Sequence, residues 1–145
     1  ADFINRIFET EGAGLDEVDD IYSLSRVYGR RKRNDKVLCL YGEMEKNASA
    51  GLEEDILWFN SLAMKRTGQW TEAARLWQRL AETDGREGYL ANLELAKFFE
   101  HRQKDLEKAL DHTRRAAGLC PDSRPHKNQL EKRFNRLSDK LKQID

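Results

Sequence analysis

Apolar and small residues recur in this chain at helical spacing and, on a longer scale, every 36 residues. Three segments begin 36 residues apart and repeat such residues at their first, fifth and eighth positions. The spacing i, i+4, i+7 marks one face of an α-helix, so each segment is predicted to be an amphipathic helix. The nine positions, in chain order, are Val37, Tyr41, Met44, Ala73, Trp77, Leu80, Ala109, Thr113 and Ala116.

A second apolar set stands sixteen residues before each segment, at Ile21, Leu57 and Leu93. It predicts a preceding helix in every unit, so that each unit is a helix, a short turn and a second helix. In the third unit the inner face of the first helix fits better one residue earlier, which indicates a turn in "EHRQKD" that is longer by one residue. The expected helices cover 16–29 and 34–47, 53–67 and 70–83, and 87–102 and 105–118.

Glycine and proline fall between these units, in "NASAG", "TDGREG" and "GLCPDSRP", where helices are expected to stop. After them, Leu130, Phe134, Leu137 and Leu141 form one stripe of a final helix whose other face is almost wholly charged. A polar-faced last helix is typical of the cap that ends a helical stack. We therefore expect an N-terminal helical segment at 1–15, helix pairs at 16–50, 51–86 and 87–121, and a capping helix at 122–145.

The stretch "RTGQWTEAARLWQRL" resembles the tetratricopeptide repeat (TPR) through Gly68, Trp70, Ala73 and Trp77. The third unit matches the same repeat at Leu106, Ala109, Ala116 and Pro121. The resemblance implies an all-α, TPR-like α-solenoid of about three antiparallel helix pairs with a C-terminal capping helix. It also implies a scaffold for protein–protein interaction.

A finer resemblance joins "LELAKFFEHRQKDLEKALDHTRRA" to the C-terminal repeats that follow an RNase H-like, DEDD-type exonuclease domain in some bacterial proteins. "LDEVDDIYSL" is similar to the end of that exonuclease domain, matching at Asp20, Ser23 and Leu24, while Asp16 and Glu17 stand where His and Asn are expected. On this interpretation residues 1–15 are the remnant of an upstream domain. The alternative function is then an accessory domain that helps bind or position nucleic acid, with no catalysis in this chain.

The formal net charge of zero hides a local asymmetry. Residues 1–20 carry one base and seven acids, whereas residues 101–145 carry twelve bases and seven acids. No part is basic enough to predict nucleic-acid binding by itself. No apolar run reaches the roughly 18 residues of a membrane span, and Cys39 and Cys120 are expected to be reduced, buried thiols of a cytoplasmic protein.

Few residues are candidates for catalysis or for binding a metal. Asp16, Glu17, Asp19 and Asp20 could bind a metal, but acids at the start of a helix more commonly offset its dipole. The three histidines lack zinc spacing, and no nucleophile–base arrangement or phosphate loop can be placed. We expect no catalytic residue, no metal and no cofactor.

Two surfaces are candidates for binding a partner. The first is a groove along the first helices of the pairs, which would hold a protein segment; its alternative is that Trp58 and Phe98 pack between units. The groove residues are Tyr22, Arg26, Trp58, Leu62, Lys65, Glu94, Phe98 and His101.

The second surface is a basic edge formed by the turns within the pairs, starting from "YGRRKRNDK". Cations there also offset the negative ends of helix dipoles, so part of the pattern has a structural cause. The edge consists of Arg30, Arg31, Lys32, Arg33, Lys65, Arg66, Arg102 and Lys104.

Overall fold

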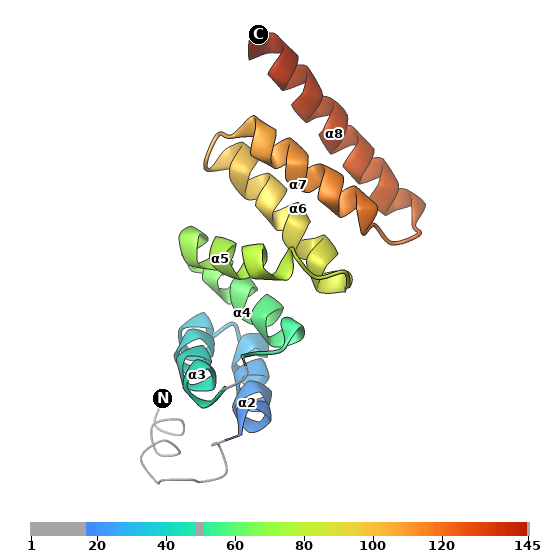
Figure 1. Cartoon of the computed structure of the whole chain (residues 1–145). Helices are drawn as coiled ribbons and strands as arrows, with labels where there is room; N and C mark the ends of the chain where they lie inside the picture. Colours follow the sequence, from blue (N-terminus) through green and yellow to red (C-terminus); the bar gives the residue numbers. More distant parts are fainter. Residues whose placement is uncertain (1–16, 49–50, 145) are drawn as a thin grey trace. The chain divides into compact units, whose positions relative to one another are not determined.

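The computed structural model describes residues 17–48 and 51–144, and this part of the chain consists of seven α-helices without a strand (Figure 1). The predicted all-α class is confirmed for these residues. The expected segment 1–15 and the candidate ligand Asp16 lie outside them. The helices are α2 (Val18–Arg30), α3 (Asn34–Asn47), α4 (Glu54–Arg66), α5 (Trp70–Leu80), α6 (Arg86–His101), α7 (Leu106–Gly118) and α8 (Arg124–Ile144).

Each helix begins and ends within three residues of its predicted bounds. The largest difference is at the end of α5, which stops at Leu80 instead of residue 83. There the backbone N–H and the hydroxyl of Thr83 both donate to the Leu80 carbonyl, at 3.0 and 2.7 Å. These bonds close a turn, which ends the helix.

The chain divides into two compact structural units after Gln69. From here on, first unit and second unit refer to this division and not to the helix pairs of the repeat. The first unit contains α2, α3 and α4, and the second contains α5 to α8. Within each unit, helices that follow one another in the sequence pack together (Figure 1). The division falls between α4 and α5, inside the predicted second pair, 51–86.

The repeated apolar positions form the core. All nine are buried, and the most exposed of them, Tyr41, has 6% of its surface accessible. Thr113, the polar member of the set, donates its hydroxyl to the Ala109 carbonyl at 2.8 Å, so its burial leaves no donor unsatisfied. In the preceding helices Ile21 and Leu57 are buried and Leu93 is partly buried.

The ends of α2 and α4, the first helices of the first two pairs, close in the same way. After α2, the N–H of Lys32 donates to the Gly29 carbonyl and that of Arg33 to the Tyr28 carbonyl, both at 3.0 Å. After α4, Gly68 and Gln69 make the corresponding bonds to Lys65 and Met64. This is the Schellman motif, which places one residue in the left-handed conformation.

The third turn, after α6, is longer by one residue, as the sequence indicated. Its closing bond runs from the N–H of Asp105 to the Phe99 carbonyl, at 2.8 Å. The residue before Asp105, Lys104, again has a positive φ of 55°. The left-handed residues of the three turns, Lys32, Gly68 and Lys104, are therefore spaced by the 36-residue period.

The last helix packs on α7 through its apolar stripe. Leu130 and Leu137 are buried, and Phe134 and Leu141 are partly buried. Leu130 belongs to a core cluster with Tyr89 and Ala116. Across residues 17–48 and 51–144, no helix has the length and apolar character needed to cross a membrane.

Candidate functional site

In the first unit, two helices of the predicted groove bring aromatic side chains together. The rings of Tyr22 on α2 and Phe59 on α4 meet edge to face, with centroids 5.5 Å apart. The guanidinium of Arg26, one turn after Tyr22, lies 5.9 Å from the centroid of the Tyr22 ring. Trp58 and Leu62, one turn apart on α4, are partly buried. We call Tyr22, Arg26, Trp58, Phe59 and Leu62 the aromatic face.

Burial raises the pKa of the Tyr22 hydroxyl, the nearby Asp55 carboxylate raises it further, and Arg26 opposes both. The phenol is therefore neutral at physiological pH and can donate or accept a hydrogen bond. Phe59 was not among the predicted groove residues, although it neighbours Trp58. The close approach of its ring depends on Gly29, because a Cβ there would lie 2.8 Å from the Cζ of Phe59.

In the second unit, most of the predicted groove is not available to a partner. Phe98 is buried, with 8% of its surface exposed, and its ring packs against Phe99 with centroids 5.4 Å apart. Glu94 is also buried and pairs with Lys97 at 3.4 Å. His101 is exposed. The burial of Phe98 leaves little ring surface for contact with a partner.

Three residues of the predicted basic edge meet in the first unit. A hollow of about 470 Å³ is lined by Gly29, Arg30, Lys32, Asn34 and Arg66, which we call the turn hollow. Arg30, Lys32 and Arg66 are exposed, and no ion pair joins them to a carboxylate of the described residues. Among the residues that the structure describes, the hollow is thus lined by three cations and no acid. Lys65 precedes Arg66 and is partly buried.

The other cations of this turn lie outside the hollow. Arg33 donates from Nε and Nη2 to the two carboxylate oxygens of Asp35, both at 3.2 Å. This hydrogen bond lowers the pKa of Asp35. Arg33 takes the N-cap position of α3 without a side-chain capping bond, and its guanidinium holds the Asp35 carboxylate. Arg31 is exposed.

The equivalent turn in the second unit has a different arrangement. The guanidinium of Arg102 stacks over the ring of Trp70, 4.0 Å from its centroid, a typical cation–π distance. Trp70 is partly buried. Lys104 is exposed.

A buried carboxylate that was not among the predicted site residues joins α6 to α8. The Glu100 side chain is 1% exposed and accepts hydrogen bonds from Arg133, Arg136 and Lys140 at 2.8–3.1 Å. Burial alone would raise its pKa, but the bonds from Arg136 and Lys140 outweigh burial and hold the pKa at about 2. Glu100 stands at the register position of Tyr28 and Met64, so a charged residue at an apolar position was the available signal.

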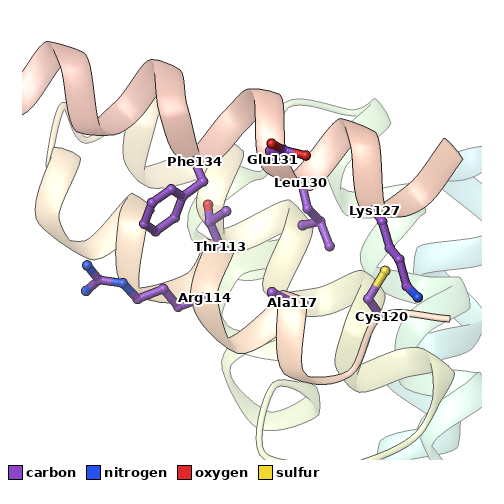
Figure 2. A pocket seen from close by; sticks show the side chains of 8 residues that line it. All are labelled: Thr113, Arg114, Ala117, Cys120, Lys127, Leu130, Glu131 and Phe134. Atoms are coloured by element: carbon purple, nitrogen blue, oxygen red, sulfur yellow. The ribbon is translucent and has the colours of Figure 1, made fainter. Parts of the chain in front are cut away.

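An apolar groove lies between α7 and α8 in the second unit (Figure 2). Its volume is about 500 Å³, and Ala117, Leu130 and Phe134 supply its apolar wall. Arg114 sits over the Phe134 ring, 5.5 Å from the centroid. The thiol of Cys120, also at this groove, is partly exposed, and Cys39 is exposed, so the expectation of two buried thiols is wrong.

The remaining candidates for chemistry are dispersed. Asp19 and Asp20 lie in the first turn of α2, and Glu17 takes its N-cap position without a side-chain bond. Among the residues that the structure describes, no three acidic, histidine or cysteine side chains gather where they could hold a metal ion. His112 is partly buried and stacks on Phe99 with centroids 5.4 Å apart.

Comparison with known proteins gives one similar sequence. A segment of 100 residues is 28% identical to the uncharacterized protein YprB of Bacillus subtilis (strain 168). The match covers 65% of this chain and 23% of the relative, so the chain spans about a quarter of that protein. No family model and no solved structure matches the chain.

Proposed function

We propose that the chain is a TPR-like helical-repeat module, an α-solenoid of about three helix pairs closed by α8. In this proposal it acts as a non-catalytic scaffold that binds a segment of a protein partner in the cytoplasm. The support for the repeat comes from the nine buried positions at 36-residue spacing and from the left-handed residues that recur with the same period. Stacked units of this kind share one continuous core and offer their surfaces for recognition.

The observation that carries the binding proposal is the aromatic face of the first unit. A partly exposed Trp58, a Tyr22–Phe59 pair and a neighbouring Arg26 combine the residue types that dominate the binding energy of protein interfaces. Aromatic rings supply a large apolar area with few rotatable bonds, and the Arg26 charge at the margin steers an acidic partner.

Selection of peptides from a displayed random library against the full chain tests this function. Trp58→Ala is expected to weaken the selected peptides by about tenfold or more, since truncation of a central aromatic commonly has an effect of that size. Trp70→Ala is the matched control, because Trp70 is also partly buried but lies in the second unit. Equal losses from both variants, with unfolding temperatures as the check on folding, would contradict the aromatic face as the binding surface.

A second candidate function is favoured by the turn hollow. Three cations, with no carboxylate among the described residues that line the hollow, suit a polyanion, as expected for an accessory domain of an RNase H-like exonuclease that holds nucleic acid. Fluorescence anisotropy with single-stranded DNA at low and high salt tests it. Binding that is absent at low salt excludes this candidate and leaves the protein-binding proposal intact.

A further inference from the structure

The turn hollow contains a lysine in a conformation that glycine adopts more easily. Lys32 has φ = 58°, and it closes the end of α2 in the same way that Gly68 closes α4. The left-handed conformation brings Cβ close to the following carbonyl oxygen, and only glycine escapes this crowding. A side chain at residue 32 therefore costs conformational free energy that glycine would avoid.

Offsetting the helix dipole does not by itself account for this lysine. A cation anywhere in the last turn of α2 serves that purpose, and Arg30 already does so at the last helical residue. The 36-residue period has its other non-glycine left-handed residue at Lys104, so two of the three turns carry lysine at this position. Neither the turn geometry nor the helix dipole therefore requires a lysine at position 32.

The surroundings of Lys32 match a phosphate group. Arg30 and Arg66 line the same hollow, and Asn34 adds a side-chain amide that can donate. A guanidinium offers paired N–H donors that fit phosphate oxygens, and an ammonium adds a mobile point charge. The volume of about 470 Å³ leaves room for a phosphate together with its substituents.

We infer that the turn hollow binds the phosphodiester backbone of a single-stranded nucleic acid, with Lys32, Arg30 and Arg66 as the contacting cations. The inference rests on the second candidate function and assigns its contact surface. The five residues that line the hollow include no aromatic ring for a base to stack on, so the contact reads charge and not sequence. The turn hollow would therefore bind the backbone of a nucleic acid, whereas the aromatic face would bind a segment of a protein.

The experiment measures anisotropy of a fluorescent oligothymidylate with the full chain over a range of salt concentrations. Lys32→Gly removes the cation and also removes the steric strain of a Cβ atom in the left-handed conformation. It should therefore raise the unfolding temperature while weakening binding. For a single strand, each phosphate contact contributes about 0.7 to the slope of log K against log salt. Losing one contact should therefore reduce the slope by about 0.7 and the affinity by roughly eightfold at about 0.05 M salt.

Matched variants separate charge from backbone geometry. Lys32→Gln removes the charge but retains the left-handed side chain, and should lose binding without the gain in unfolding temperature. Lys104→Gly relieves the same backbone conformation in the second unit and should leave affinity within about twofold, because Lys104 does not line this hollow. Arg66→Gln should weaken binding as Lys32→Gln does.

The possible failures are distinct. No oligothymidylate binding by the unchanged chain at low salt overturns both the inference and the second candidate function. Binding that Lys32→Gln and Arg66→Gln leave unaltered overturns the inference alone, since nucleic acid would then be held elsewhere. Tighter binding of a phosphopeptide of matched length and charge overturns the assignment to nucleic acid.

Discussion

The Nδ1 atom of His112 lies 2.9 Å from the Oδ1 atom of Asn92, and this contact joins α7 to α6. The Asn92 amide nitrogen is already committed, because it donates to the carbonyls of Gly88 and Ala81 at 2.9 and 3.3 Å. The Asn92 oxygen must therefore accept, which makes Nδ1 of His112 the protonated ring nitrogen. One fully buried amide thus connects the end of α5, the start of α6 and the middle of α7.

Replacing this amide should destabilise the second unit. Asn92→Ala removes the partner of two buried carbonyls and of His112, and we expect the free energy of unfolding to fall by about 2 kcal/mol. Asn47→Ala is the matched control, because Asn47 donates to the carbonyl four residues earlier in the same way but is exposed. Urea unfolding of both variants measures the difference. A loss from Asn47→Ala as large as that from Asn92→Ala would contradict the role of burial.

The same contact predicts a dependence of stability on pH. Burial lowers the pKa of His112 below its usual 6.5, and Arg115 lowers it further. The unfolded chain therefore binds this proton more readily, so stability should fall as pH decreases below about 6.5. His112→Gln should remove that part of the pH profile, whereas His126→Gln, at an exposed position, should leave it. Urea midpoints between pH 5 and pH 8 measure the effect.

The Glu100 cluster predicts that one carboxylate anchors α8. Glu100→Gln leaves Arg133, Arg136 and Lys140 around a neutral amide, and we expect a loss of about 3 kcal/mol in the free energy of unfolding. Hydrogen exchange should show that protection is lost first in α8. Glu107→Gln, at an exposed acid in the first turn of α7, is the control and should change stability by less than about 0.5 kcal/mol.

Acid should have the same effect as this substitution. The pKa of Glu100 is lowered from 4.5 to about 2, so the carboxylate stabilises the folded state fully above pH 4.5. That contribution to stability is lost progressively as the pH falls from 4.5 to about 2, because the unfolded chain binds the proton at a higher pH than the folded state does. Glu100→Gln should lack this part of the acid transition. An unchanged profile in the variant would assign the transition to other carboxylates.

The helices could be predicted because their signals are local. Apolar residues recur at helical spacing within each segment, glycine and proline mark the breaks between segments, and the structure has helices where this pattern places them. Burial of individual side chains was predictable only in part. Cys39 stands two residues after Val37, about 200° around the helix from the core face, so the pattern itself favours the exposure that is found.

The Glu100 cluster could not be predicted, since its cations stand 33 to 40 residues later in the chain. Helical periodicity shows which face of α6 is buried but not which face of α8 covers it. Phe98 and Phe99 are adjacent in α6 and yet both are buried, and the ring of Phe99 stacks on His112 of α7. Contacts of this kind depend on packing between helices.

The left-handed residues of the turns give a test of the repeat that needs no partner. Gly68 has φ = 79°, so Gly68→Ala should destabilise the chain by about 1 kcal/mol. Lys104→Gly should do the reverse and stabilise it by roughly 0.5–1 kcal/mol, since the relief of the backbone exceeds the added entropy of the unfolded chain. Lys104→Ala retains the strained Cβ and should give no gain, which separates backbone relief from loss of charge. Thermal unfolding of the three variants measures these differences, and a gain from Lys104→Ala equal to that from Lys104→Gly would show that charge, and not the left-handed backbone, governs the stability of this turn.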